Sequence, residues 1–417
     1  MVLEDIVIGR DPETLRKYGK TGCGFLGKHV VGSGFESHVT NPVQLDLTNP
    51  HVMLILGKRG SGKSYTGGVL AEEIMNLPQE VKKNLTCIMI DTMGIFWSMK
   101  NSNDEALLLL KKWGMEPKGF ETFNIVPAGL AGLYREKDVP FDDVFSIRPA
   151  DLSVGDWLLT FGLDIFSGMG ILLERVISKL SGNYNINDII RKIESDKKSS
   201  EKERLALENR FSAAHNWGIF SENGTDIEAL LQGGRAIVLD ISLQEWNVRN
   251  LLLGILAREI YQIRTKARRE EESEKISGRG KMKVPMVWFI MDEAHNFLPA
   301  QGKTAATDPL LTLITQGRQP GISCAFITQR PNKLHADAVS QADMVISHRL
   351  TSKEDLDSLS SIMQTYLLED IRKGISKLPK TKGSAVVLDD NSERLFNIQV
   401  RPRESWHAGS TPIALEK

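Results

Sequence analysis

A chain of 417 residues can bury a large core, and its length favours two or three domains, or one domain with large insertions. Its 25% charged and 41% apolar residues are ordinary for a globular protein and exclude disorder throughout. The formal net charge of -1 gives no overall attraction to nucleic acid, so such binding must come from a local basic surface or from loops repeated in an oligomer.

The three cysteines, Cys23, Cys87 and Cys324, are odd in number, widely spaced and contain no C-x-x-C pair. This pattern supports neither a disulfide framework nor a zinc site, and it favours a reducing compartment. The first residues show no basic segment followed by an apolar one, and no apolar run approaches the roughly 18 residues of a membrane span. We therefore expect a cytoplasmic protein that does not enter a membrane.

The first part of the chain predicts strands followed by a strand, a loop and a helix. Residues 1–48 carry many turn formers around short apolar runs, which indicates a short N-terminal β region. Residues 51–56 form an apolar run that ends at a glycine-rich loop, and residues 65–75 have helical character. Residues 86–91 form another apolar run closed by an acid, as expected of a buried parallel strand.

Residues 101–232 differ from the segments on either side and predict a helical insertion, with helices over 107–113, 151–163, 171–180 and 202–217. Alternation of strand and helix then resumes over 235–241, 250–264, 286–291, 324–328 and 344–347. The mixed charge run from Arg264 to Lys283 is interpreted as a solvated helix end and loop. The sequence thus predicts an α/β core over 49–100 and 233–400, interrupted by the insertion.

The glycine-rich loop matches G-x-x-x-x-G-K-[ST] and consists of Gly57, Lys58, Arg59, Gly60, Ser61, Gly62, Lys63 and Ser64. Glycines let backbone N–H groups face phosphates, and the helix that follows adds the positive end of its dipole. Tyr65 at the start of this helix is therefore also a candidate for binding the nucleotide. Lys63 would reach the β- and γ-phosphates, and the Ser64 hydroxyl would bind Mg²⁺, a cation that takes oxygen ligands. This P-loop predicts an ATP site; an ordinary glycine-rich turn is the disfavoured alternative.

Two acids, Asp292 and Glu293, follow the predicted strand over 286–291, and ligands bind at this end of strands in open α/β sheets. Asp292 would hold Mg²⁺ through water, and Glu293 would orient and polarise an attacking water. The pair therefore predicts hydrolysis of ATP rather than transfer of its phosphate. The alternative interpretation is a buried strand that ends in a helix-capping pair.

Four further polar residues are candidates for the same site. Gln329 would sense the γ-phosphate if its strand lies beside the one that ends in Glu293; otherwise it begins a surface loop. Arg318 and Arg349 are candidate arginine fingers, and each could instead be an exposed salt-bridge partner. A finger is often supplied by a neighbouring subunit, which suggests an oligomer. His295 has no second His or Cys at ligand spacing, which favours a structural or coupling role over a metal site.

The order of these motifs resembles the HerA/FtsK superfamily of hexameric DNA-translocating ATPases, and within it the HerA-like branch of archaea and bacteria. The resemblance covers residues 40–100 and 233–410. It rests on a series of segments: Gly57 to Ser64, Ile290 to His295, Gln316 to Gly321, Ile327 to Leu334, Val339 to Asp343 and Arg403 to Pro412.

The resemblance implies a RecA-like core, a homohexameric ring, ATP-driven movement of double-stranded DNA, and work beside a nuclease in DNA end processing. It also implies that Arg318 is a trans-acting arginine, that Gln329 is a polar sensor, and that residues 401–417 form a C-terminal brace. The N-terminal β region of 48 residues is shorter than the family's N-terminal barrel, where nuclease partners dock. That difference argues against a nuclease partner.

Other classes of protein fit less well. Residues 292–295 spell the hallmark of DEAH helicases, but too few residues follow for a second RecA-like lobe. An ABC signature that begins at Leu180 is broken by Asn183 and Tyr184, and no N-K-x-D motif indicates a GTPase. An ATP-dependent assembly switch or scaffold stays open as an alternative, although Glu293 argues against a pure switch.

Overall fold

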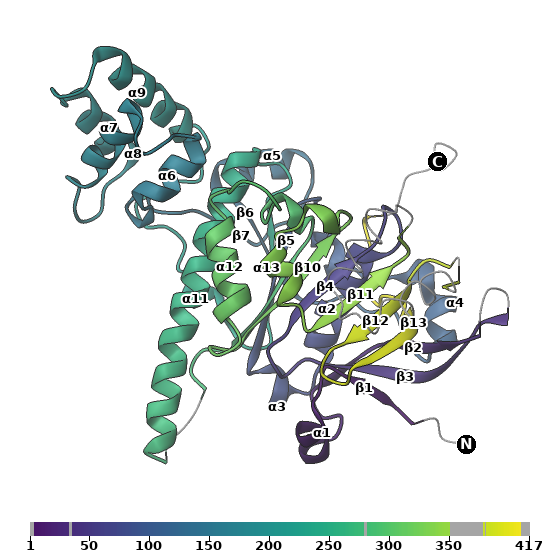
Figure 1. The fold of residues 1–417 in the computed structure, drawn as a ribbon. Coiled ribbons are helices and arrows are strands. Elements are labelled where there is room, and N and C mark those ends of the chain that lie inside the picture. The colour runs from purple at the N-terminus through teal and green to yellow at the C-terminus, as the bar shows by residue number, and fades with distance from the viewer. Residues whose placement is uncertain (1–3, 33–35, 279–281, 351–377, 380, 410–417) are drawn as a thin grey trace, which may run out of the picture.

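The computed structural model describes residues 4–409, apart from 33–35, 279–281, 351–377 and 380. The described strands join one mixed sheet, which confirms the predicted α/β class (Figure 1). From one edge to the other, the strands are β1 (Ile6–Ile8), β3 (His38–Asp46), β2 (Cys23–Val31), β13 (Arg394–Val400), β12 (Ser384–Asp389), β11 (Met344–His348), β4 (Val52–Leu56), β10 (Ile322–Thr328), β9 (Met286–Met291), β5 (Leu85–Asp91), β8 (Ala236–Asp240), β6 (Thr122–Pro127) and β7 (Asp143–Phe145).

The strands from β11 to β7 are parallel, so their carboxyl ends share one edge of the sheet. Thr328 at the end of β10 is in register with Leu56 at the end of β4. Met291 at the end of β9 pairs with Ile90 of β5. The loops that follow β4, β9 and β10 therefore meet at this carboxyl edge.

The predicted N-terminal β region is an extension of the core sheet. β2 pairs antiparallel with both β3 and β13, and β13 pairs with β12, which joins β11. Residues from β1 to β3, among them Ile8, Leu26 and Val43, share one buried cluster with Met53 and Ile55 of β4. These shared contacts make the N-terminal strands part of the core.

The described helices comprise α1 (Pro12–Tyr18), α2 (Lys63–Asn76), α3 (Gln79–Lys82), α4 (Leu107–Lys112), α5 (Ala131–Glu136), α6 (Val154–Phe161), α7 (Gly168–Ile177), α8 (Ile186–Glu194), α9 (Glu201–His215), α10 (Ile227–Leu230), α11 (Trp246–Ile276), α12 (Thr307–Gln316) and α13 (Ala336–Ser340). Short 3-10 turns are η2 (Trp97–Lys100), η3 (Asp104–Ala106), η4 (Ala128–Leu130), η5 (Pro149–Asp151), η6 (Ala294–Asn296) and η7 (Pro331–Lys333). Among the described residues, no helix combines the length and apolar character that crossing a membrane requires.

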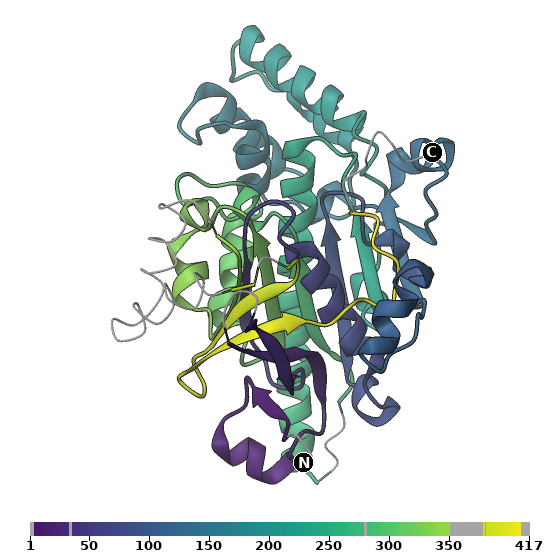
Figure 2. The ribbon, with the colours of Figure 1, turned by 90° about the vertical axis from the view of Figure 1, so that its right-hand side faces the viewer.

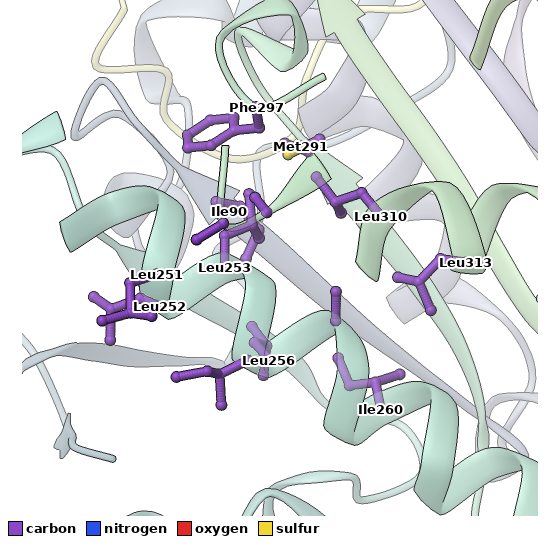
Figure 3. Packing of buried hydrophobic residues seen from close by; sticks show 14 of the residues in the cluster. Ile90, Leu251, Leu252, Leu253, Leu256, Ile260, Met291, Phe297, Leu310 and Leu313 are labelled. Carbon is purple, nitrogen blue, oxygen red and sulfur yellow. The ribbon is translucent and has the colours of Figure 1, made fainter. Parts of the chain in front are cut away.

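The parallel strands are covered by helices on both faces. On one face, α2 packs on strands that include β4, β5 and β10 and shares a buried cluster with them. On the other face, α11 and α12 contribute residues to a second large buried cluster. Figure 3 shows Leu252, Leu256 and Ile260 of α11 in a cluster with Ile90 of β5 and Leu313 of α12. This two-sided burial explains why the central strands are nearly continuous apolar runs.

The helical insertion is smaller than predicted. Helices α6 to α9 form a group at one end of the molecule, and α1 with β1 lies at the other end, as the views in Figure 1 and Figure 2 agree. The predicted insertion over 101–232 needs correction, because it contains β6 and β7, which extend the parallel sheet. The purely helical part is bounded by Val154 and His215.

The charge run after residue 264 also differs from the prediction, because α11 continues through it to Ile276. Arg264 is 1% exposed, and its guanidinium donates to the carboxylate of Glu271 at 3.1 Å and to the backbone oxygen of Pro320. Lys283 forms ion pairs with Glu270 and Glu274. These contacts explain why the helix extends beyond the apolar pattern.

Candidate active site

The P-loop connects β4 to α2 and has the backbone geometry that an anion site requires. Gly57, Gly60 and Gly62 have φ angles of 151°, 74° and 112°, which favour glycine. At Gly57 a Cβ would lie 2.5 Å from Ser61 Oγ and 2.7 Å from His348 Cβ, so a larger residue does not fit. No side chain caps α2, so its first N–H groups are available to a phosphate.

Lys63, the first residue of α2, is buried at the bottom of this loop. Its Nζ donates a hydrogen bond to the backbone oxygen of Lys58 at 3.1 Å. Burial lowers the pKa of Lys63, while the carboxylates of Glu293 and Asp292 act in the opposite direction. The ammonium group thus lies between the loop backbone and the acid pair.

The acid pair follows β9 directly and faces the P-loop. Ser64 Oγ donates to Asp292 Oδ2 at 2.7 Å, and the backbone N–H of Glu293 donates to Asp292 Oδ1 at 2.8 Å. Burial raises the pKa of Asp292, and the hydrogen bond from Ser64 partly offsets this effect. A hydroxyl oxygen and a carboxylate oxygen at this distance are ligands of the type that Mg²⁺ takes. The donor set therefore fits the predicted metal.

Glu293 has an unusual environment for a surface acid. Its φ angle of 48° lies in the left-handed region, a strained conformation that is common at functional sites. Its Oε2 is buried without a hydrogen-bond partner among the described residues. Burial and the charge of Asp292 raise its pKa, and Lys63 and Arg330 counteract this shift. The carboxylate thus lies beside the P-loop, and one of its oxygen atoms has no hydrogen-bond partner among the described residues.

The structure brings Gln329 to the same edge, because β10 lies between β4 and β9. Gln329 is half-buried and follows Thr328, which pairs with the last residue of β4. The neighbouring Arg330, which sequence reasoning did not single out, is exposed and close enough to influence the pKa of Glu293. Because Arg330 directly follows Gln329, the sequence could have predicted that it lies near the site.

The two candidate arginines lie at opposite ends of the parallel strands. Arg349 follows β11 at the carboxyl edge, and its backbone oxygen accepts from the Lys58 N–H at 3.1 Å. Arg318 is exposed in the turn between α12 and the start of β10, at the amino edge. A strand the length of β10 spans about 20 Å, so Arg318 cannot reach the P-loop of its own chain.

His348 is a buried residue of the site that sequence reasoning missed. It ends β11 beneath the P-loop, with its Nε2 2.8 Å from Thr66 Oγ1 and its Nδ1 3.2 Å from the backbone oxygen of Ser384. Burial lowers its pKa to about 4, so the ring is neutral and can accept from Thr66 and donate to Ser384. The rule that groups at carboxyl ends of parallel strands converge could have identified it.

A second buried cluster ties the chain after β13 to α2, the P-loop helix. Glu72 of α2 accepts from Arg401 Nη1 at 2.8 Å and from Arg403 Nε at 3.2 Å, and all three side chains are 0% exposed. The Ser405 hydroxyl and N–H also donate to Glu72. The guanidinium of Arg403 lies against Gly68, where a Cβ would be 2.6 Å from its Nη1. Residues 410–417 of the predicted brace lie outside the described residues.

We expect Glu72→Ala to destabilise the fold by about 3–5 kcal/mol, because two buried guanidinium groups lose their shared carboxylate. Burial alone would raise the pKa of Glu72, but Arg401 and Arg403 outweigh it and hold the pKa below 4.5. The stabilisation is therefore present above that pH and is lost as the pH falls through the folded-state pKa.

Chemical denaturation at pH 7 and at pH 3 measures this effect, and the difference between wild type and variant should shrink at the lower pH. Glu80→Gln, on the exposed surface of the neighbouring helix α3, is the control and should leave the midpoint unchanged. Equal stability of wild type and Glu72→Ala at pH 7 would contradict the expectation.

Comparison with known proteins places this chain in a family. The protein-family model described as the central domain of helicase HerA matches residues 26–260, more than half of the 417 residues. The chain belongs to the HerA helicase central-domain family. This membership confirms the resemblance predicted from the motifs. The acid pair and Gln329 lie beyond the matched range.

Two curated HerA relatives show the extent of the similarity. A probable DNA double-strand break repair helicase HerA of Methanocaldococcus jannaschii is 23% identical over 355 residues, 78% of this chain and 66% of that protein. The DNA double-strand break repair helicase HerA of Pyrococcus furiosus is 26% identical over 192 residues, 42% of this chain and 34% of that protein. The chain thus spans less than two thirds of the length of either relative.

Solved structures share the fold of this HerA-family chain. VirB4 of Thermoanaerobacter pseudethanolicus superposes with a TM-score of 0.57 at 14% identity and covers 90% of this chain and 96% of its own. The bacterial conjugative coupling protein TrwBdeltaN70 gives a TM-score of 0.52 at 11% identity, with 92% of each chain covered. At these identities the likeness concerns the fold alone.

Proposed function

We propose that this chain is a Mg²⁺-dependent ATP hydrolase that moves double-stranded DNA as a homohexameric ring, in DNA end processing or defence. The observation that carries the proposal is the convergence of Lys63, Ser64, Asp292 and Glu293 at one edge of the sheet. Membership of the HerA family and two relatives named as double-strand break repair helicases support the DNA part. The three free cysteines are compatible with a cytoplasmic place of action.

Each residue at the edge has a role in this proposal. The P-loop N–H groups and Lys63 bind the phosphates of ATP. Ser64, directly, and Asp292, through water, would hold Mg²⁺, which would neutralise charge on the phosphate oxygens. Glu293 orients and polarises the attacking water, and Gln329 responds to the γ-phosphate. For Lys63, this requires that its amine leave the backbone oxygen of Lys58 for the nucleotide.

The position of Arg318 supports a ring. An arginine that stabilises the charge of the transition state must touch the γ-phosphate, and Arg318 lies about one strand length from its own P-loop. A neighbouring copy that places its amino edge against this carboxyl edge would bring Arg318 to the nucleotide. We therefore assign Arg318 as the finger in trans.

Native mass measurement and particle images, with a non-hydrolysable ATP analogue and duplex DNA, test the proposal directly. We expect a six-fold ring that encloses DNA, and steady-state ATP turnover that increases when duplex DNA is added. A monomer under these conditions would contradict the ring. A stable ATP-dependent assembly whose turnover ignores DNA would favour a switch or scaffold instead of a motor.

A further inference from the structure

The chain after the acid pair and the chain after Gln329 are hydrogen-bonded to each other. The backbone N–H of Ala300 donates to the oxygen of Lys333 at 2.9 Å, and the N–H of His335 donates to the oxygen of Leu298 at 2.8 Å. The segments that follow β9 and β10 therefore form one paired unit beside the P-loop. These backbone hydrogen bonds join the segment after β10 to the segment that follows Glu293.

His295 lies at the start of this paired unit and contacts both strand ends. Its Nδ1 is 2.9 Å from Thr328 Oγ1 and 3.4 Å from Glu293 Oε2, the buried oxygen that has no hydrogen-bond partner among the described residues. The Thr328 hydroxyl already accepts a hydrogen bond from the backbone N–H of Arg330 at 3.0 Å. The imidazole nitrogen is thus placed between the residue that precedes Gln329 and the candidate water-activating acid.

The carboxylate of Glu293 favours one tautomer of His295. An unprotonated Nδ1 could accept from the Thr328 hydroxyl but would direct its lone pair toward the carboxylate oxygen, which is unfavourable, whereas an Nδ1–H can donate to Thr328 Oγ1 and attracts Glu293 Oε2 at 3.4 Å. Burial, together with Arg330 and Lys333, lowers the pKa of His295 to about 4, so the ring is neutral at pH 7. His295 therefore acts on Glu293 as a neutral donor of fixed direction.

We propose that His295 is a positioning residue whose Nδ1–H holds Glu293 Oε2 and links it to Thr328. The other carboxylate oxygen, Oε1, is left to orient the attacking water. The link joins Glu293 to the strand end that carries Gln329, so that contact of Gln329 with the γ-phosphate is transmitted to the water-activating group. This inference rests on the roles proposed above for Glu293 and Gln329.

Paired substitutions at positions 295 and 328 test the link. His295→Phe keeps an aromatic ring but removes the donor, and we expect kcat for ATP to fall about 10- to 100-fold. KM and the affinity for ATP should change less than about twofold, because the proposed link acts on Glu293 and not on the bound nucleotide. His295→Asn, whose amide can take the place of Nδ1–H, should recover most of the loss. Thr328→Val should reduce kcat, whereas Thr328→Ser should not.

A merely structural role predicts a different pattern, in which Phe and Asn at position 295 are equally slow and both lower the thermal midpoint. The double variant with His295→Phe and Glu293→Gln distinguishes a positioning role from a structural role. If His295 acts through Glu293, adding His295→Phe to Glu293→Gln should lower kcat by less than about threefold. Wild-type kcat in His295→Phe, or the full loss again in the Glu293→Gln background, overturns the link. Wild-type turnover in Glu293→Gln alone would instead refute the role of Glu293 itself.

Discussion

Glu293→Gln should bind ATP with wild-type affinity and hydrolyse it at least about 100-fold more slowly, a loss of about 2.7 kcal/mol of transition-state stabilisation. The amide keeps the size of the side chain but cannot accept a proton from water or polarise it as a carboxylate does. Burial and the charge of Asp292 raise the pKa of Glu293, and its Oε2 has no hydrogen-bond partner among the described residues, as a group that is to act on a proton of water requires. Equilibrium binding of a fluorescent ATP analogue and phosphate release measure the two properties.

The control for this substitution is Glu194→Gln, which makes the same chemical change at an exposed position at the end of α8. It should leave both affinity and turnover unchanged. Wild-type turnover in Glu293→Gln would remove the basis for hydrolysis at this site. Loss of ATP binding would instead place Glu293 among the nucleotide-binding groups.

Arg318→Ala subunits should be inactive alone and regain activity when they are mixed with Lys63→Ala subunits. Removal of an arginine finger costs about 10³-fold or more, and removal of the P-loop lysine weakens ATP binding. In a mixed ring, some sites combine the intact Lys63 of one subunit with the intact Arg318 of its neighbour. The measurement is ATP turnover against the mixing ratio, with maximal rescue expected at intermediate ratios.

Arg349→Ala provides a matched control for the complementation, because residue 349 lies beside the P-loop of its own chain, where its backbone oxygen accepts from the Lys58 N–H. The exposed Arg349 side chain can therefore act only at this site or at a neighbour that faces it. Any loss of activity in Arg349→Ala that arises at its own P-loop acts in cis, so mixing with Lys63→Ala subunits should not rescue it. Arg269→Ala, an exposed arginine of α11, should remain active without mixing. Absence of rescue for Arg318→Ala, in rings shown to contain both subunits, would exclude a finger in trans.

The sequence predicted the features of the site that are local in the chain. The P-loop is eight contiguous residues between a strand and a helix, and Asp292 and Glu293 end an apolar run, so spacing and periodicity were sufficient. The central strands were also predicted, because burial on both faces makes them apolar throughout. The convergence of Gln329 with the acid pair followed only once β10 was placed between β4 and β9.

Two of the missed features depend on partners far along the chain or on buried polar groups, and a third had a local signal. β6 contains Asn124 and Pro127, which weaken a strand pattern; Asn124 is nevertheless buried, and its amide donates to the backbone of Trp97. α8 begins with a capping box between Asn185 and Asp188, a signal that was present but not used. The arginines that bind Glu72 are more than 300 residues away in the sequence, and no local pattern reveals them.

The close approach of Arg403 to Gly68 has a consequence for the evolution of this chain. Any side chain at position 68 would collide with the guanidinium, and loss of that guanidinium would leave Glu72 with a single arginine. Positions 68 and 403 should therefore vary together among close homologues: glycine is needed where arginine is present, and alanine or serine becomes acceptable where it is not. A survey of natural variants that keep Glu72 can detect this covariation without any biochemical assay.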